Sequence, residues 1–114
     1  MLSALCTLGG ESLINTPSVY LSPNDSAPHV RYSTKSNPDE GIGSVGGELP
    51  LNKWYHLAYT LSEPEKQLKF YKDGQLVGIQ STKDEIVFND RPLFIGNSVA
   101  FLGITGQIRY DFIP

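Results

Sequence analysis

Three short runs of alternating apolar and polar residues follow one another in the middle of the chain. They cover Trp54–Leu61, Gln67–Lys72 and Gln75–Gln80. Asp73-Gly74 separates the last two runs, and this dipeptide suits a type I′ turn, because both central residues of such a turn need a positive φ. A period of two residues is typical of a strand that buries one face and exposes the other. The segment therefore predicts a three-stranded antiparallel meander.

The alternation also assigns the faces of these strands. Leu57 and Leu61 share one face of the first run, and Leu68 and Phe70 share one face of the second. We expect these four side chains to lie in the core, because one face of a sandwich sheet is buried. Trp54 falls on the opposite face from Leu57, where it either covers a sheet edge or lies on the outer surface.

Short apolar runs bounded by turn residues recur along the rest of the chain, which has 11 glycines and 8 prolines among its 114 residues. No segment keeps a 3.6-residue apolar period over the roughly 10 residues that a helix needs. This pattern predicts an all-β antiparallel β-sandwich, and the length predicts a single domain over residues 1–114. Further strands are expected at Ala4–Leu8, Ser18–Ser22, His29–Thr34, Val45–Leu49, Glu85–Phe88, Leu93–Gly96 and Gly106–Ile113.

Charge and cysteine content narrow the partners and the compartment. The formal net charge is −3, which argues against nucleic acid as the main partner. No apolar run approaches the ~18 residues of a membrane-spanning helix, so membrane insertion is not expected. Cys6 is the only cysteine, so no internal disulfide forms and a buried, unreactive thiol is expected. With no signal peptide in this chain, the compartment leans intracellular or bacterial, and an extracellular location stays open.

Five motifs follow one another between residues 47 and 112. In this order they resemble the laminin G-like domains of the concanavalin A-like lectin/glucanase superfamily. The resemblance implies a jelly-roll sandwich. The motif residues are Leu49-Pro50-Leu51, then Trp54, His56-Leu57-Ala58 and Thr60, then Leu68, Phe70, Tyr71 and Asp73-Gly74, then Pro92-Leu93-Phe94-Ile95-Gly96, and finally Gly106, Ile108, Arg109 and Tyr110.

The resemblance also implies that strands are missing at the N-terminus. Members of the family begin with further strands before the position of Ala4, and one of them pairs with the closing strand. We therefore expect the chain to be a fragment of a larger multidomain protein or a minimal variant. Loss of that pairing predicts an open sheet edge at Gly106–Ile113. Such an edge invites strand addition by a partner or formation of a homodimer.

No pattern of catalytic residues accompanies the motifs. Glucanases of the superfamily carry carboxylates at alternate positions of one strand, and retaining hydrolysis needs two carboxyl groups about 5 Å apart. Glu63 and Glu65 instead flank Pro64, while Asp39-Glu40 and Asp84-Glu85 are adjacent pairs that would point to opposite faces of a strand. The sequence also lacks a Gly-x-Ser-x-Gly elbow, a phosphate-binding loop and a zinc-ligand pattern. We expect no enzymatic activity.

The expected function is that of a non-catalytic binding module of a larger protein, which recognises a carbohydrate or a glycan-bearing ligand. Lectin-like sites offer aromatic faces and a few polar groups to a sugar. Side chains of these types are Tyr20, Arg31, Tyr32, Trp54 and His56, and each also has an interpretation as a rim or core residue. The alternative is a protein–protein interaction or scaffold domain that uses an open sheet edge or the outer sheet face.

Calcium is the one cofactor that the resemblance brings into question. Some laminin G-like domains hold calcium at the rim of the sandwich, where oxygen atoms of Asp, Asn and backbone carbonyls serve as ligands. The matching candidates are Asp25, Asn89 and Asp90. All three are also ordinary turn residues.

Overall fold

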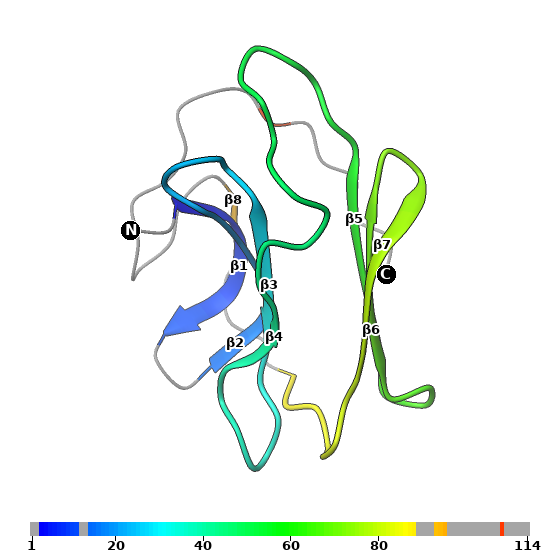
Figure 1. Ribbon diagram of the computed structural model, residues 1–114. Coiled ribbons are helices and arrows are strands. Elements are labelled where there is room, and N and C mark those ends of the chain that lie inside the picture. Colours follow the sequence, from blue (N-terminus) through cyan, green and yellow to red (C-terminus); the bar gives the residue numbers. More distant parts are fainter. Residues whose placement is uncertain (1–2, 12–13, 89–92, 96–107, 109–114) are drawn as a thin grey trace.

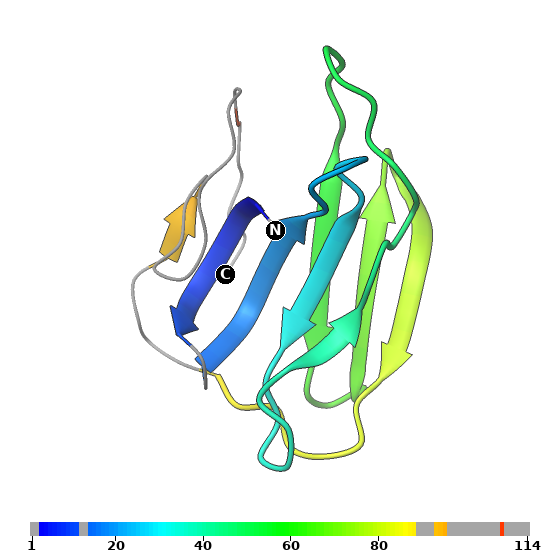
Figure 2. The same ribbon diagram turned by 60° about the vertical axis from the view of Figure 1, so that its left-hand side comes forward.

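The computed structural model describes residues 3–11, 14–88, 93–95 and 108, and the regular secondary structure in them consists of strands. Two antiparallel sheets face each other (Figures 1 and 2). The larger has the order β4-β3-β2-β1-β8, and the smaller has the order β5-β6-β7. The predicted all-β sandwich is confirmed. The strands are β1 (Ser3–Glu11), β2 (Ile14–Leu21), β3 (Pro28–Tyr32), β4 (Glu40–Ile42), β5 (Leu57–Ser62), β6 (Gln67–Lys72), β7 (Gln75–Ser81) and β8 (Leu93–Ile95).

The chain builds this sandwich from two meanders. Strands β1 to β4 lie side by side in chain order, and β5 to β7 do the same in the facing sheet. The chain then returns to the larger sheet, where β8 pairs antiparallel with β1 and Ile95 lies opposite Cys6. Each sheet is therefore mostly local in sequence, and the two crossings between the sheets determine how they are stacked.

The meander of the smaller sheet has the predicted register and turn. Asp73 has a φ of 51° and Gly74 a φ of 82°, as a type I′ turn requires. Leu61 lies opposite Leu68 across β5 and β6. Leu68 and Phe70 are 0% and 1% exposed, and Leu57 and Leu61 pack against them from the sheet's inner face. The predicted core positions of this sheet are confirmed.

In the core, these side chains pack with Val19, Val30 and Tyr32 of the larger sheet. Val45, from the loop after β4, belongs to the same buried cluster. A fully buried apolar side chain of this size contributes about 1.5–3 kcal/mol to folding.

Two hydrogen bonds of tyrosine side chains cross this core. The Tyr59 hydroxyl on β5 donates to the backbone carbonyl of Arg31 on β3 at 2.8 Å. The Gln80 amide on β7 donates to the Tyr32 hydroxyl on β3 at 3.2 Å. Burial raises the pKa of Tyr59 far above its usual range, and the nearby Tyr32 raises it further. Each bond joins the smaller sheet to the larger one.

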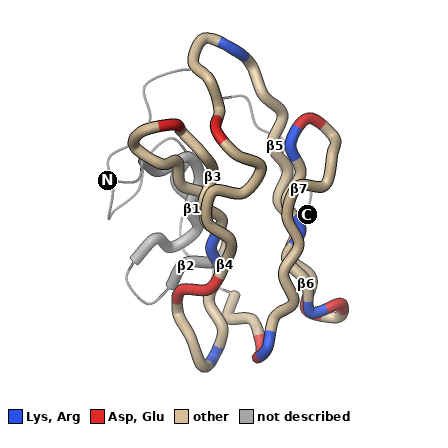
Figure 3. Tube along the Cα trace, in the orientation of Figure 1, with Lys and Arg blue, Asp and Glu red and all other residues tan. Residues whose placement is uncertain are grey.

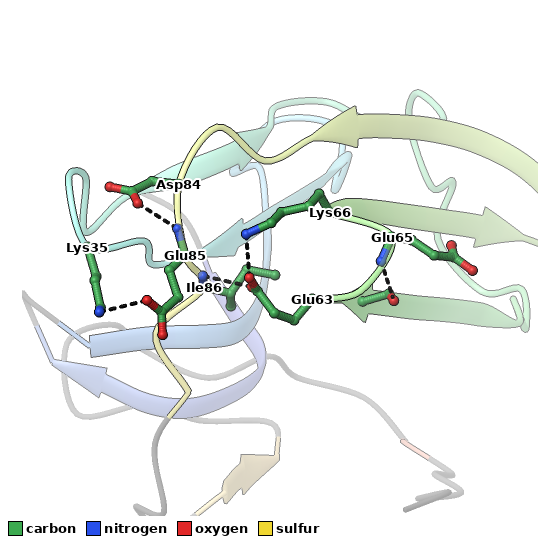
Figure 4. A network of polar contacts seen from close by, with 8 residues as sticks. Lys35, Glu63, Glu65, Lys66, Asp84, Glu85 and Ile86 are labelled. Atoms are coloured by element: carbon green, nitrogen blue, oxygen red, sulfur yellow. Dashed lines mark hydrogen bonds and ion pairs between the residues drawn. The ribbon is translucent and has the colours of Figure 1, made fainter.

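Hydrogen bonds and an ion pair hold the segment that follows β7 against the loops after β3 and β5 (Figure 4). The Ile86 amide donates to Glu63 Oε2 at 3.0 Å, and the Lys35 amide donates to the Glu85 carbonyl at 3.0 Å. Lys35 Nζ also forms an ion pair with Glu85 Oε2 at 2.6 Å. The predicted strand Glu85–Phe88 is wrong, because this stretch forms a single bridge between Ile86 and Thr34.

Two other predicted strands differ from the structure. Val45–Leu49 is a loop, because Gly46 and Gly47 have φ values of 77° and 78° and take the chain out of the extended conformation. β4 lies earlier, in a stretch that looked like a turn. It lies against β3 at Gly41, where a Cβ would be 1.8 Å from the Val30 carbonyl oxygen.

The strand predicted at Trp54–Leu61 begins only at Leu57, so Trp54 and His56 belong to the preceding loop. The predicted open edge at Gly106–Ile113 lies outside the described residues apart from Ile108, and it stays a prediction.

The Tyr59→Phe variant tests the bond that crosses the core. It leaves the Arg31 carbonyl without its partner, so we expect a loss of about 1–3 kcal/mol in the free energy of unfolding. Tyr71→Phe is the matched control, because Tyr71 lies on the same sheet but pairs with Ala58 on the face opposite to Tyr59. Urea unfolding measures both variants. Equal losses in the two would contradict the assigned role.

The raised pKa of Tyr59 also predicts a loss of stability in alkali. In the unfolded chain this phenol loses its proton near pH 10, whereas the folded protein keeps it. The unfolded state therefore binds fewer protons above pH 10, and the free energy of unfolding falls by up to about 1.4 kcal/mol per pH unit. Unfolding curves between pH 9 and 11 should show a steeper decline for the wild type than for Tyr59→Phe. Parallel declines would count against a buried, protonated phenol.

Candidate functional site

The two tyrosines that were predicted to bind a ligand, Tyr20 and Tyr32, are core residues. Tyr32 is fully buried on the inner face of β3, where its hydroxyl accepts the bond from Gln80. Tyr20 on β2 lies opposite His29 and is 3% exposed. Neither ring has a face open to a sugar, so the expectation of stacking at these two positions is corrected. The sequence pattern placed both residues on strands but did not show which strand faces are covered.

Arg31 lies apart from the other candidates. It follows Val30 on β3 and faces away from the core, with 26% of its side chain exposed. Its Nε forms an ion pair with Asp39 Oδ1 at 3.4 Å. No contact among the described residues connects Arg31 to Trp54 or His56.

Trp54 and Phe88 are the aromatic residues of the described chain that are more than half exposed. Trp54 lies in the loop between β4 and β5, residues 43–56, here called the Trp54 loop. This loop projects beyond the ends of both sheets (Figures 1 and 2). Trp54 is 61% exposed and Leu51 is 81% exposed. His56 is also exposed. Of the five predicted ligand-binding residues, Trp54 and His56 therefore lie on the same accessible loop.

Asp73 fastens the base of the Trp54 loop to the β6–β7 hairpin. The His56 amide donates to Asp73 Oδ1 at 2.9 Å, and the Asp73 amide donates to the His56 carbonyl at 2.7 Å. Asp73 reaches this position because the type I′ turn holds it in a left-handed conformation. These two hydrogen bonds between Asp73 and His56 hold the chain in a fixed position two residues after Trp54.

Lys72 supports the loop from the same hairpin. Its Nζ donates to the carbonyls of Gly46 and Glu48, both at 3.3 Å. It also lies 5.7 Å from the centre of the Tyr55 ring, and Lys53 Nζ lies 5.5 Å from the same ring. Cations at this distance are attracted to the electron-rich face of an aromatic ring. Tyr55 is further fixed by its hydroxyl, which donates to the Pro50 carbonyl at 2.8 Å.

The resulting site is an aromatic surface flanked by donors. Trp54 offers a broad apolar face, and Lys53 and His56 on either side of it in sequence add groups that can donate hydrogen bonds. Sequence reasoning missed the roles of Lys72 and Asp73. For Asp73 the sequence indicated only the turn. Its bond to His56 joins residues 17 positions apart, so no local pattern indicates it.

The calcium candidates are only partly within the described chain. Asp25 lies in the turn after β2, where its Oδ1 accepts a bond from the Ala27 amide at 3.0 Å and its carbonyl accepts one from the Leu49 amide. Within the described residues, no group of three or more His, Cys, Asp or Glu side chains could hold a metal ion. Asn89 and Asp90 lie outside the described residues. Calcium binding at these positions stays a prediction.

Glu63 and Glu40, two carboxylates of the described chain, have structural partners. Lys66 lowers the pKa of Glu63, and the bond from the Ile86 amide lowers it further. Glu40 Oε2 accepts a bond from the Thr34 hydroxyl at 2.6 Å. A general acid for glycoside hydrolysis needs a raised pKa, whereas the pKa of Glu63 is lowered.

A Ser–His contact is present near the turn after β2. Ser22 Oγ and His29 Nε2 are 2.8 Å apart. Burial lowers the pKa of His29, Arg31 lowers it further, and Asp25 partly opposes the change. The Asp25 Oδ1 atom accepts a hydrogen bond from the Ala27 amide. The Ser22–His29 contact therefore has the geometry of a bond that stabilises the turn and not of a catalytic triad.

No helix that could span a membrane is found among the residues described.

Comparison with known proteins places the sandwich in a family. A laminin G-like family model described as the concanavalin A-like lectin/glucanases superfamily matches residues 7–109. The match covers every strand from the middle of β1 to β8, and it confirms the resemblance seen in the motifs. Neither a curated protein nor a solved structure gave a significant match. Laminin G-like domains are generally non-enzymatic modules that bind protein or glycan ligands, although the superfamily includes glycosidases. The chain belongs to the concanavalin A-like lectin/glucanases superfamily.

Proposed function

We propose that the chain is a non-catalytic module that binds a carbohydrate on the Trp54 loop. The observation that carries the proposal is the 61% exposure of Trp54 on a loop whose base is fixed by Asp73. Leaving a large aromatic ring in water is unfavourable. An exposed ring held on a fixed base is the arrangement that sugar-binding sites use, because the flat apolar faces of a sugar stack on it.

The surroundings of Trp54 support the same proposal. The loop is preorganised by the two hairpin residues Lys72 and Asp73, so little conformational entropy is lost when a ligand binds. Lys53 and His56, one residue before and two residues after Trp54 in the sequence, have side chains that can donate hydrogen bonds to sugar hydroxyl groups. The engaged carboxylates Glu63 and Glu40 support a binding role over a hydrolytic one.

The alternative is a protein ligand at the same loop. It is favoured by Leu51, which is 81% exposed three residues before Trp54, because neighbouring exposed apolar side chains mark many protein-interaction sites. A carbohydrate ligand needs the donors around Trp54, whereas a protein ligand depends more on Leu51.

Replacement of Trp54 tests the proposal. Screening on a glycan array identifies a ligand, and calorimetry measures its affinity. We expect Trp54→Ala to weaken binding by tenfold or more, because losing a central aromatic contact costs roughly 1.4 kcal/mol or more. Leu76→Ala is the control, because Leu76 is 50% exposed on β7. Trp54 is the only tryptophan, so its fluorescence reports binding independently.

Three results would decide between the alternatives. A glycan ligand whose affinity is unchanged in Trp54→Ala would refute the site. An array without any hit would count against a carbohydrate ligand. If a protein ligand is then found, we expect Leu51→Ala to weaken its binding.

The Asp73→Ala variant tests how the loop is held in place. It removes the bond from the His56 amide, so we expect faster hydrogen exchange of that amide and weaker ligand binding. Asp73→Asn should behave like the wild type, because asparagine keeps the acceptor oxygen and tolerates the left-handed conformation. Hydrogen exchange followed by NMR makes the comparison. Unchanged protection of the His56 amide in Asp73→Ala would show that the bond does not hold the loop.

A further inference from the structure

The Trp54 loop is attached to the larger sheet as well as to the smaller one. The Leu49 amide donates to the Asp25 carbonyl at 2.9 Å, and the Val45 amide donates to the Pro28 carbonyl at 2.9 Å. Asp25 belongs to residues 22–27, which join β2 to β3 and are here called the β2–β3 turn, and Pro28 is the first residue of β3. Figure 3 shows an acidic position in this turn and another in the β6–β7 hairpin, with the Trp54 loop between them. The projecting part of the loop therefore has one anchor on each sheet.

The carboxylate of Asp25 determines the shape of the β2–β3 turn. Its Oδ1 atom accepts a hydrogen bond from the Ala27 amide at 3.0 Å, which closes an Asx turn. Ser26, between these two residues, has a φ of 56°, a conformation that residues with a side chain seldom adopt. The Ser22 amide also donates to the Ala27 carbonyl at 3.0 Å, so the two ends of the turn are joined. The Asp25 carbonyl belongs to the peptide unit between Asp25 and Ser26, which lies inside the ring that the Asx turn closes.

The anchor at Leu49 leads directly to the exposed part of the loop. Leu49 is 8% exposed, and a buried amide that loses its acceptor destabilises the structure around it. The next residue, Pro50, has the carbonyl to which the Tyr55 hydroxyl donates at 2.8 Å. Residues 50–55 thus form a closed segment that begins beside the Leu49 anchor, and Trp54 lies inside it. Movement at Leu49 would be passed on to Trp54 through this segment.

We propose that Asp25 is a positioning residue of the Trp54 site. By holding the β2–β3 turn in shape, its carboxylate keeps the Leu49 anchor in place, as the Asp73 carboxylate keeps the His56 anchor in place on the other sheet. A loop held at only one end samples conformations that cannot bind, and the apparent affinity falls in proportion to the fraction of the binding-competent conformation. The orientation of Trp54 then depends on both sheets.

A calcium ion would use the same carboxylate in a different way. As a calcium ligand, Asp25 would contribute its charge, whereas the hydrogen bond from the Ala27 amide needs only an acceptor oxygen. Asparagine at this position keeps that oxygen and forms the same turn. The Asp25→Asn and Asp25→Ala variants therefore separate a positioning role from a metal-binding role.

The effect on ligand affinity rests on the proposed function, but the effect on the loop does not. The order of the loop can be measured without any ligand, and a loop that loosens in Asp25→Ala would uphold the positioning role even if no glycan bound. A glycan that binds to a loop whose order does not depend on Asp25 would leave the proposed function standing and would overturn this inference.

Hydrogen exchange followed by NMR and the fluorescence anisotropy of Trp54 test the inference on the free protein. In Asp25→Ala we expect exchange of the Leu49 amide to be faster by about fivefold or more and the anisotropy to be lower. Exchange of the Phe70 amide, in the centre of β6, should be unchanged. Asn24→Ala is the matched control, because Asn24 is the neighbouring exposed residue of the same turn. It should behave like the wild type in both measurements, and so should Asp25→Asn.

Calorimetry with a glycan selected on the array extends the test to binding. We expect the dissociation constant to rise about three- to tenfold in Asp25→Ala and to stay unchanged in Asp25→Asn. Unchanged exchange of the Leu49 amide in Asp25→Ala would overturn the proposal. Equal acceleration at Leu49 and Phe70 would also overturn it, because it would indicate a general loss of stability. An Asp25→Asn variant as loose as Asp25→Ala, together with a wild-type loop that a chelator loosens, would assign Asp25 to a bound cation instead.

Discussion

The stacking of the two sheets depends on tyrosine hydroxyl groups that are buried in an apolar core. A buried hydroxyl must find a partner, or folding loses the free energy of its desolvation. For Tyr59 the partner is a backbone carbonyl in the opposite sheet, and for Tyr32 it is the Gln80 side chain. Apolar contacts alone would tolerate small sliding of one sheet over the other. These two directional bonds define a single offset, and the positions of the loops at the ends of the sandwich follow from it.

The sequence predicted the parts of the fold that rest on local chemistry. The β5–β6–β7 meander followed from period-two alternation, and the Asp73-Gly74 turn followed from its need for positive φ. The strand prediction failed between β3 and β5, where glycine decided the outcome. Val45–Leu49 alternates like a strand but contains Gly46-Gly47, while β4 needs Gly41 to approach Val30. Such a close approach is a property of two segments and has no signature in either one.

The candidate site shows the same difference between local features, which the sequence indicates, and contacts between distant segments, which it does not. The sequence named Trp54 and His56 as candidates for a role besides packing, and the structure places both on the exposed loop. It also proposed Tyr20 and Tyr32, which lie on strands of the predicted type but are buried. Exposure is decided by what the rest of the chain covers, and alternation within one strand does not show this. The contribution of Asp73 was equally hidden, because a turn residue gains its second role only when the hairpin meets the loop.

Gly78 determines the position at which β7 can pass close to the larger sheet. A Cβ at this position would lie 2.4 Å from Val45 Cγ2 and 3.2 Å from Ile42 Cδ1, so β7 passes under the larger sheet at its one residue without a side chain. A shift of β7 by one residue would bring Val77 or Ile79 to the same place, where neither fits. The tolerance of the domain to insertions and deletions is therefore uneven. One residue added or removed between Gly78 and the end of β7 would move Gly78 out of register with Val45, whereas a change in length of the projecting part of the Trp54 loop would leave both sheets in place.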